Sequence, residues 1–421
     1  MKEKALISKQ ITLRAGKAIF GGYCIGRQGG KVVLIKYALP GEKIKASVDA
    51  EKKDYCTASV LEVLEPSPDR VDPKCKFFAS CGGCQFQFIS YAAQVRLKQE
   101  ILEDSLKRFA KLDMIPFLPP VQGIPWNYRF RAQFKVSGGR TGFYRKKTRQ
   151  VVDINYCPVM TKGINRTLAE LRDLMGKNVY GIKEIQISSG ENTGGFIKVN
   201  ARIPDTVFHS MLKPMFIKAG LRSAVIQSQK RDIVEYGQPY IALDLEGLKY
   251  TVSPLSFFQS NWVLNKKVVG LIKELLSPVG GKKILDLYSG GGNFSLPLAQ
   301  EADEVTAVEE SPYSVDDGKR NAHINDIGNC MFINSSVEGF EVPLDINAVI
   351  VNPPRAGLSA ASQEKTMNIE AEMILYLSCN PASVSRDIRK FLKKYDLESV
   401  RLVDFFPQTY HIESLAVLRK K

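Results

Sequence analysis

The stretch ILDLYSGGGNFSLPLA, residues 284–299, places a glycine-rich turn between an apolar run and an amphipathic segment. This order predicts a buried strand, a tight turn and a helix. Glycines at such a turn let a ligand approach the backbone closely, as in nucleotide-binding α/β sheets. Glu309 ends the next strand-like run, nineteen residues after Gly290, and a carboxylate there typically accepts hydrogen bonds from ribose hydroxyls. The stretch therefore predicts a nucleotide-like site, which on this evidence would equally admit NAD.

The same pattern continues to the C-terminus, because apolar runs and helix-like segments alternate from about residue 251 onward. This alternation predicts a doubly wound α/β domain. The turn itself, D-L-x-S-G-G-G-N-F from Asp286, resembles the first motif of class I S-adenosylmethionine methyltransferases more than a dinucleotide fingerprint. VIVNPPR (349–355) matches the [D/N]-P-P motif of the same superfamily, and its two prolines fix a turn that aims Asn352 into the site. The resemblance implies a Rossmann-like methyltransferase domain over residues 251–421 that binds S-adenosylmethionine.

A lone cysteine follows the next apolar run, LYLSCNPASVSRD (375–387). Because the carboxyl ends of parallel strands share one crevice, Cys379 is expected near the methyl donor. A buried structural cysteine is the alternative. A thiolate that adds to C6 of a pyrimidine makes C5 nucleophilic, and a base must then remove the C5 proton. FFPQTYHIES (405–414) offers His411 and Glu413, and a carboxylate suits the role of the base, although Glu413 could also be an ordinary surface residue.

The charge distribution indicates a polyanionic partner. Residues 1–250 hold 41 of the 59 basic side chains but 23 of the 44 acidic ones, whereas the remainder of the chain is slightly acidic. A basic front half suggests that one part of the protein grips a nucleic acid that another part modifies, although a solubility role is also possible. Aromatic and basic residues alternate most densely in residues 127–154, where the predicted RNA contacts are Arg129, Arg131, Arg145, Lys146, Lys147 and Arg149.

The N-terminal half divides into two predicted parts. Residues 1–66 contain short β-branched runs between glycines, which indicates a small OB-like β-barrel suited to binding a nucleic-acid backbone. A Pro-rich linker follows, and residues 67–250 are expected to form a central α+β domain. Within it, residues 89–112 have helical apolar spacing and predict an amphipathic helix that packs on the catalytic domain.

Four cysteines are grouped within the central part. Cys75, Cys81 and Cys84 lie close together, with two glycines between the last two, and Cys157 follows much later. Four thiolates with this spacing suit either tetrahedral zinc or an iron–sulfur cluster, and spacing alone does not choose between them. Unrelated buried cysteines are the remaining alternative. With no secretion signal in the sequence, a disulfide framework is not expected.

Several motifs together resemble the RNA (uracil-C5)-methyltransferase family, in order and in spacing. The motifs are FFQSN (257–261), DLYSGGGNFSLPLA, NPPRAGL, LSCNPASVSRD and FPQTYHIES. The similarity spans essentially the whole chain, since residues 1–66, with YALPGE, and the following SPDRVDPKC resemble the N-terminal TRAM domain of the family.

The resemblance implies a role for each matching residue. Cys379 would be the nucleophile and Glu413 the proton-abstracting base. Phe257 would lie beside the flipped base together with Asn352, and the four cysteines would carry a [4Fe-4S] cluster. The positions that match S-adenosylmethionine contacts are Gln259, Tyr288, Gly290, Asn293, Glu309 and Asn352.

The implied reaction is formation of 5-methyluridine in RNA, with 23S rRNA favoured and tRNA as the alternative. Asn352 stands where the family usually has aspartate, and an amide can accept or donate a hydrogen bond. A cytosine-C5 enzyme, an adenine amino-methyltransferase and an inactive RNA-binding homologue are the less favoured interpretations. We expect a cytoplasmic protein, because the sequence has neither a signal peptide nor an apolar run of membrane-spanning length. We also expect a monomer.

Overall fold

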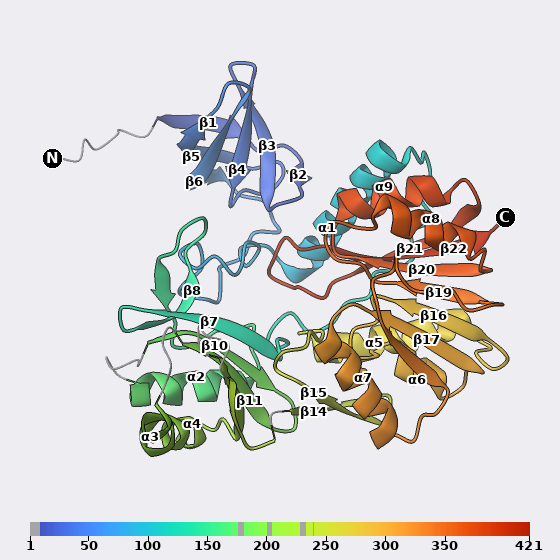
Figure 1. Cartoon of the computed structure of the whole chain (residues 1–421). Coiled ribbons are helices and arrows are strands. Elements are labelled where there is room, and N and C mark those ends of the chain that lie inside the picture. The colour runs from blue at the N-terminus through green and yellow to red at the C-terminus, as the bar shows by residue number, and fades with distance from the viewer. Residues whose placement is uncertain (1–8, 176–180, 200–203, 228–232, 239) are drawn as a thin grey trace.

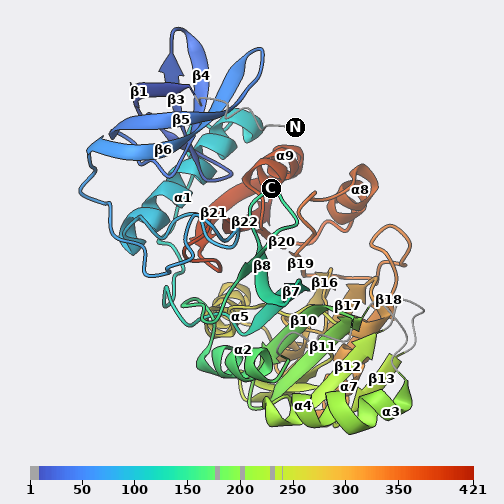
Figure 2. The same ribbon diagram turned by 90° about the vertical axis from the view of Figure 1, so that its left-hand side faces the viewer.

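The structure is a computed structural model of the chain. It describes residues 9–175, 181–199, 204–227, 233–238 and 240–421. Within these residues the strands form three large sheets and one two-stranded sheet. Figure 1 shows the N-terminal sheet standing apart from the other two large sheets, and Figure 2 shows the same arrangement from the side. The first eight residues of the predicted N-terminal module lie outside the described residues.

The N-terminal sheet has six strands in the order β1-β5-β6-β4-β3-β2. Its pairs are antiparallel except β4 and β6, and β5 carries three register irregularities against β6. Alternating burial along the strands gives this sheet its own apolar cluster. The strands are β1 (Gln10–Arg14), β2 (Ala18–Ile19), β3 (Tyr23–Gln28), β4 (Lys31–Lys36), β5 (Lys43–Glu51) and β6 (Tyr55–Glu65).

The central sheet has seven strands in the order β13-β12-β11-β10-β7-β8-β9. The strands are β7 (Arg131–Ser137), β8 (Arg140–Tyr144), β9 (Val151–Asp153), β10 (Ile182–Ser189), β11 (Thr193–Val199), β12 (Ser223–Gln227) and β13 (Ile233–Tyr236). Residues of the helical segments join the central cluster, with α2 packing on β10. These segments are α2 (Lys162–Met175), α3 (Asp205–Val207), the π-helical turn η2 (Phe208–Leu212) and α4 (Lys213–Lys218).

The C-terminal sheet also has seven strands, in the order β18-β17-β16-β19-β20-β22-β21. The first five are parallel, whereas β22 runs antiparallel to both of its neighbours. The strands are β16 (Lys283–Leu287), β17 (Glu304–Glu309), β18 (Cys330–Asn334), β19 (Ala348–Val351), β20 (Met373–Ser378), β21 (Tyr395–Val403) and β22 (Glu413–Lys420). The prediction of a Rossmann-like, doubly wound mixed sheet is confirmed.

Helices cover both faces of the C-terminal sheet, because alternate residues of each strand join different apolar clusters. In β20, for example, Leu375 belongs to one cluster and Ile374 to the other. One face is covered by α5 (Trp262–Leu276), α6 (Ser295–Ala299) and α7 (Pro312–Ile324), and the other by α8 (Ala360–Asn368) and α9 (Pro381–Phe391). Burial on both faces explains why these strands read as continuous apolar runs.

The helix predicted over residues 89–112 is α1 (Tyr91–Ser105), followed by a π-helical turn, η1 (Leu106–Ala110). Its apolar face packs on the C-terminal sheet beside α9, since Val95, Ile101 and Leu102 share a cluster with α9 residues. In Figure 1, α1 lies next to α9, although it precedes the central sheet in sequence. Thus α1 physically links the start of the chain to the C-terminal sheet.

The two-stranded sheet, β14 (Ile241–Leu245) and β15 (Leu248–Val252), shares the apolar cluster of the C-terminal sheet. β14 also contacts the turn between β10 and β11 of the central sheet, where the N–H of Glu191 donates to the carbonyl of Ala242 at 2.9 Å. The backbone of the two-stranded sheet is held by α7, where Asn321 accepts a hydrogen bond from the N–H of Thr251 at 2.8 Å. The predicted boundary between residues 250 and 251 therefore falls inside β15.

Candidate active site

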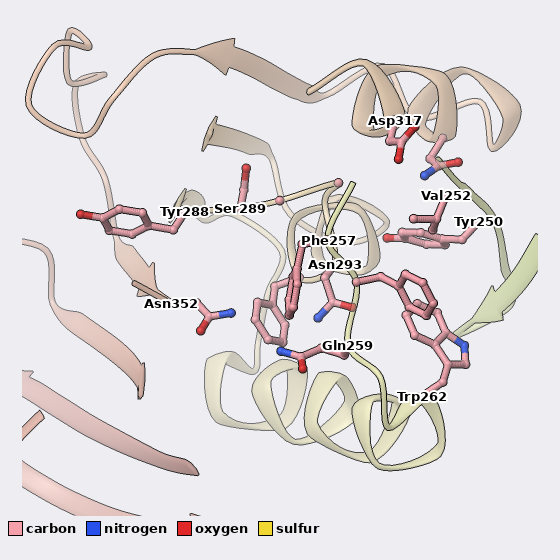
Figure 3. Close-up of a pocket in the computed structure, with 15 residues that line it drawn as sticks. Tyr250, Val252, Phe257, Gln259, Trp262, Tyr288, Ser289, Asn293, Asp317 and Asn352 are labelled. Atoms are coloured by element: carbon pink, nitrogen blue, oxygen red, sulfur yellow. The ribbon is translucent and has the colours of Figure 1, made fainter. Parts of the chain in front are cut away.

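A cavity opens at the carboxyl edge of the C-terminal sheet, where the segments after β16 and β19 converge with residues 250–262. Figure 3 shows Phe257, Gln259 and Asn293 gathered on one side of it, while Tyr288 points away from them. The predicted residues that line this cavity are Phe257, Gln259, Tyr288, Gly290, Asn293 and Asn352. Residues that the sequence analysis did not assign also line it, among them Tyr250, Trp262, Asp317 and Asn321.

Glu309 holds the glycine turn through hydrogen bonds to backbone N–H groups, and its side chain does not line the cavity. Its carboxylate accepts hydrogen bonds from the N–H of Gly290 at 3.0 Å and of Ser311 at 2.8 Å. Tyr288 and Gly290 both have positive φ, at 61° and 58°, so the chain turns sharply as it leaves β16. The turn formed in this way lies along the cavity.

Asn293 is positioned by a second asparagine. Asn265, fully buried on α5, donates to Asn293 at 2.6 Å and accepts from it at 3.1 Å. Such a reciprocal amide pair fixes the orientation of both side chains. The cavity thus combines amides and aromatic walls with the carboxylate of Asp317, and this set of groups fits a nucleoside with an amino-acid tail, as in S-adenosylmethionine.

Cys379 and Glu413 are brought together by strand register. Ser378 of β20 pairs with Ser414 of β22, so one residue further along this antiparallel pair, Cys379 lies opposite Glu413. Directly opposed residues point to the same face of a sheet. Cys379 is half-buried and Glu413 is buried. The predicted nucleophile and base therefore face the same side, one strand from Asn352.

Arg355, which the sequence analysis did not assign, is the cation of this site. Burial raises the pKa of the Cys379 thiol, and Glu413 raises it further, whereas Arg355 lowers it. Burial raises the pKa of Glu413 to about 7, against the opposing effect of Arg355. Burial lowers the pKa of His411 to about 4, so this imidazole is neutral at neutral pH. A carboxyl group with a pKa near 7 is the better general base.

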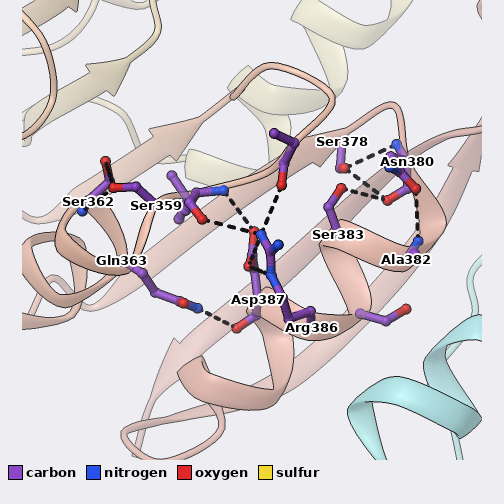
Figure 4. Close-up of polar contacts among 12 residues, drawn as sticks. Ser359, Ser362, Gln363, Ser378, Asn380, Ala382, Ser383, Arg386 and Asp387 are labelled. Atoms are coloured by element: carbon purple, nitrogen blue, oxygen red, sulfur yellow. Dashed lines mark hydrogen bonds and ion pairs between the residues drawn. The ribbon is translucent and has the colours of Figure 1, made fainter.

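The backbone around Arg355 is held by Asn380 and by α9, the helix that Asn380 caps. Figure 4 shows Asn380, Ser383 and Asp387 at this helix. The carbonyl of Arg355 accepts from Asn380 at 3.1 Å and from Ser383 at 3.2 Å. Asp387, fully buried, accepts from the Tyr376 hydroxyl at 2.7 Å and from the N–H of Leu358 at 2.9 Å. The helix thereby fixes Arg355 and the cysteine as one unit.

Phe257 marks the entrance to the site. It is 67% exposed, and it lines both the cofactor cavity and a neighbouring surface groove that includes Arg129 and Gln133. An exposed ring at such a junction is suited to stacking against a base. Arg131 lines the same groove, and its guanidinium donates to the carbonyls of Ser256 and Pro254.

The remaining predicted RNA contacts lie in and beside the turn between β8 and β9. Arg145, Lys147 and Arg149 are exposed. Lys146 lies over the ring of Tyr23 at 5.1 Å, which joins this turn to the N-terminal sheet. The basic turn of the central sheet thus contacts the N-terminal sheet.

All four grouped cysteines line one cavity of ≈ 240 Å³, together with Thr409 of the segment before β22. Burial raises the pKa of Cys81 and Cys84 to about 11 and that of Cys157 to about 12. Among the residues that the structure describes, no group of three or more His, Cys, Asp or Glu side chains could hold a metal ion. The thiols therefore surround a common space without forming a compact ion site.

Comparison with known proteins agrees with this architecture. Residues 90–421 match the tRNA (uracil-5-)-methyltransferase family. An uncharacterized RNA methyltransferase of Aquifex aeolicus is 33% identical over 98% of this chain and 99% of its own. The 23S rRNA (uracil(1939)-C(5))-methyltransferase RlmD of Methylococcus capsulatus is 31% identical over 100% of this chain and 99% of its own.

The fold of a solved structure is also similar. Pyrococcus abyssi tRNA (uracil-54, C5)-methyltransferase, in complex with S-adenosyl-L-homocysteine, superposes with a TM-score of 0.79 at 24% identity, covering 96% of this chain and 99% of its own. Fold and cavity thus define an S-adenosylmethionine-dependent methyltransferase. The chain belongs to the RNA (uracil-C5)-methyltransferase family, as its motifs predict. No helix in the described part of the chain is long and apolar enough to cross a membrane.

Proposed function

We propose that this chain forms 5-methyluridine in 23S rRNA through a covalent bond between Cys379 and C6 of the target uridine. The observation that carries the proposal is the register that sets Cys379 opposite Glu413, beside a cavity fit for S-adenosylmethionine. A thiol and a carboxyl group on one face match the two tasks of C5 methylation, which are activation of the ring and removal of the C5 proton.

The proposed reaction begins with Cys379. Its thiolate bonds to C6, and the electrons of the C5–C6 double bond move toward the O4 carbonyl, so that C5 becomes nucleophilic. Bound S-adenosylmethionine would supply the methyl group to C5, and the bond between that methyl group and sulfur breaks to leave S-adenosylhomocysteine. Glu413 then accepts the C5 proton, the C5–C6 double bond re-forms, and the bond between C6 and sulfur breaks to return the thiolate. Arg355 favours the ionised forms of both Cys379 and Glu413.

Six residues are proposed to hold S-adenosylmethionine: Gln259, Tyr288, Gly290, Asn293, Glu309 and Asn352. Glu309 supports the turn through Gly290, and its place at the end of β17 is the one from which a carboxylate typically accepts hydrogen bonds from ribose hydroxyls. Phe257 and Asn352 would contact the flipped base. Because Asn352 offers both an acceptor and a donor, cytosine is the competing base to test beside uracil.

The preference for 23S rRNA is supported by the similarity to RlmD over the full length of the chain. The exposed Arg145, Lys147 and Arg149, with Arg129 in the groove beside Phe257, are proposed to contact RNA phosphates. A tRNA substrate is the alternative. We further propose that the enzyme acts in the cytoplasm as a monomer.

The proposed domain division follows the sheets. The N-terminal six-stranded sheet is proposed to be the OB-like TRAM domain, and the central sheet with the cysteine cavity the second domain. We place the start of the methyltransferase domain near residue 240 instead of 251, because β14 and β15 share its apolar cluster. Helix α1 would belong with the methyltransferase domain in space.

The cysteine cavity is proposed to hold a [4Fe-4S] cluster through Cys75, Cys81, Cys84 and Cys157. Around a single zinc ion with Zn–S bonds of about 2.3 Å the four sulfurs would lie within ~4 Å of one another, and no such compact group is present among the described residues. A cluster is larger than one ion, and the cavity of ≈ 240 Å³ supports it. When bound, the cluster would supply structural cross-linking.

A covalent trap tests the proposed function. RNA that carries 5-fluorouridine has no C5 proton for the base to remove, so with S-adenosylmethionine the wild-type protein should form a complex that survives denaturation. A 23S rRNA fragment should be trapped more efficiently than tRNA, and uridine more efficiently than cytidine analogues. Absence of any covalent complex with either RNA would overturn the proposal.

A further inference from the structure

The segment from Asp404 to Ile412, here called the base loop, leads from β21 directly to Glu413. Its backbone carbonyls are bound by groups from distant parts of the chain. The carbonyl of Phe405 accepts from Asn261 at 3.2 Å, and that of Pro407 accepts from the Tyr128 hydroxyl at 2.9 Å. The shape of the loop is therefore held from outside as well as by its own hydrogen bonds, such as that from the Thr409 hydroxyl to the carbonyl of Phe406 at 2.9 Å.

Two buried residues of α1 make the most concentrated contacts with the base loop. Gln94 is fully buried, accepts from the N–H of Gln408 at 2.8 Å and donates to its side-chain oxygen at 3.0 Å. It also donates to the carbonyls of Phe86 and Ile89 at 3.1 and 2.8 Å. The side-chain amide of Gln94 thus makes four hydrogen bonds, two of them with Gln408 of the base loop.

Gln408 needs this support because its φ is +68°, in the left-handed region that side chains other than glycine rarely adopt. Its carbonyl accepts from the N–H groups of Gln85 and Phe86, both at 3.0 Å. These two residues directly follow Cys84 of the cysteine cavity. The unusual conformation of the loop is therefore held jointly by α1 and by the cysteine segment.

Lys98 provides the second contact, one helical turn beyond Gln94. Its ammonium lies 2.6 Å from the carboxylate of Asp404 and 2.9 Å from the carbonyl of Phe406. Both charged side chains are completely buried. Breaking such a pair leaves an uncompensated charge in the interior, so the pair holds the first residues of the loop firmly in place.

We infer that Gln94 and Lys98 are positioning residues that set Glu413 against C5 of the substrate. The inference rests on the proposed function, because it assigns them to proton abstraction and not to attack by Cys379. Cys379 directly follows β20, and the backbone beside it is held by Asn380 and α9. Helix α1 packs on α9 through other residues, among them Leu102 and Ser105, whereas the hydrogen bonds of Gln94 and Lys98 reach the base loop, Phe86 and Ile89. A displaced base loop should therefore slow release of the product more than formation of the adduct.

The experiment measures the two steps separately in the full chain. Gln94→Met keeps the length of the side chain and removes its donors and acceptor. With uridine-containing RNA and S-adenosylmethionine, we expect adduct formation within about 3-fold of wild type, but product release slower by roughly 10- to 100-fold, because a small misplacement of a catalytic group has effects of this size. The covalent complex should therefore accumulate on a denaturing gel.

A matched control comes from Asn329, whose amide ties the carbonyls of Ala299 and Ala302 at the opposite edge of the sheet. Asn329→Leu should leave the ratio of the two rates unchanged. If Gln94→Met fails to fold, the charge-neutral pair Lys98→Met with Asp404→Asn is tested in its place.

Two results would overturn the inference: equal slowing of both steps in the α1 variants, or accumulation of adduct in Asn329→Leu as well. Failure of the proposed function is distinguished by the 5-fluorouridine trap. If wild type forms no covalent complex with 5-fluorouridine RNA, the covalent mechanism is wrong and the inference is wrong with it. If wild type forms that complex but the α1 variants accumulate no adduct with ordinary uridine, only the inference is wrong.

Discussion

Two cysteine environments in this protein illustrate how surroundings decide the chemistry of a thiol. Cys379 is half-buried at a strand end, with Arg355 lowering its pKa against the effect of burial. Cys81 and Cys84 line a shared cavity in which burial raises the pKa of each to about 11. Burial and Glu413 keep the pKa of the Cys379 thiol above its ordinary value, and Arg355 opposes that rise and favours the thiolate, whereas the grouped thiols surround a space for a ligand that removes their protons.

The largest expected effect is at Cys379. Cys379→Ala should lower methylation by on the order of 10⁴-fold or more, since removal of a covalent nucleophile leaves only binding effects. The 5-fluorouridine complex should be absent, while the unfolding temperature stays near that of wild type because the side chain is half-buried. Tritium release from C5-labelled uridine measures the reaction. Methylation by Cys379→Ala at a rate close to wild type would show that Cys379 is not the nucleophile, and the contrast with the grouped cysteines would then be wrong.

Glu413→Gln is expected to have the next largest effect. An amide of similar shape cannot accept the C5 proton, so product release should slow by about 10²- to 10⁴-fold, while attack by Cys379 continues. Trapped protein–RNA complex should accumulate with ordinary uridine. Glu398→Gln, an exposed member of a surface ion pair on β21, is the control. Unchanged release by Glu413→Gln would assign proton abstraction to another group.

The comparison also shows what a sequence can predict. The apolar runs of β16, β19 and β20 predict the parallel sheet because burial on both faces leaves few polar positions, and the glycine turn locates the cofactor cavity. Strand order then brings Cys379 near it.

Contacts between residues that lie far apart in the sequence could not be predicted from any local pattern. Lys98 reads as an ordinary lysine on a helix, because its partner Asp404 is 306 residues away. Arg131 reads as an RNA contact by charge, and its guanidinium also holds backbone carbonyls of residues 254 and 256. Arg355 follows a recognised motif, yet its position beside Cys379 depends on the hydrogen bonds of α9.

In the cysteine cavity, Cys157→Ser should lower the stability of the protein more than its rate of methylation. Loss of one ligand should abolish visible absorption from a cluster in anaerobically prepared protein and lower the free energy of unfolding by on the order of 3 kcal/mol. Cys330→Ser, at a half-buried cysteine on β18, is the control for replacing sulfur by oxygen. A colourless wild-type protein that contains zinc would contradict the cluster.

The pH dependence separates base from nucleophile. The pKa of Glu413 is raised to about 7, and only the ionised form accepts a proton, so product release should fall about 10-fold per pH unit below 7. His411, with a pKa of about 4, does not titrate there. The stability of the fold should depend on pH in the opposite direction. Because folding raises the pKa of Glu413, the folded protein favours the protonated carboxyl group. The contribution of Glu413 to the free energy of unfolding is therefore lost as the pH rises from about 4.3 to 7. A rate of release independent of pH from 5.5 to 8 would exclude Glu413.

The smallest expected effect is at the cofactor cavity. Asn265→Ala removes the buried amide that orients Asn293, and both of their hydrogen bonds. Because Asn265 lines no part of the cavity itself, the change should act through Asn293 alone and raise the KM for S-adenosylmethionine by about 5- to 10-fold, corresponding to roughly one hydrogen bond. The rate at saturating cofactor and the KM for RNA should stay near wild type. Isothermal titration with S-adenosylhomocysteine checks the affinity directly, and an equal loss of affinity for RNA would indicate a general disturbance of α5 in place of a local effect on the cofactor.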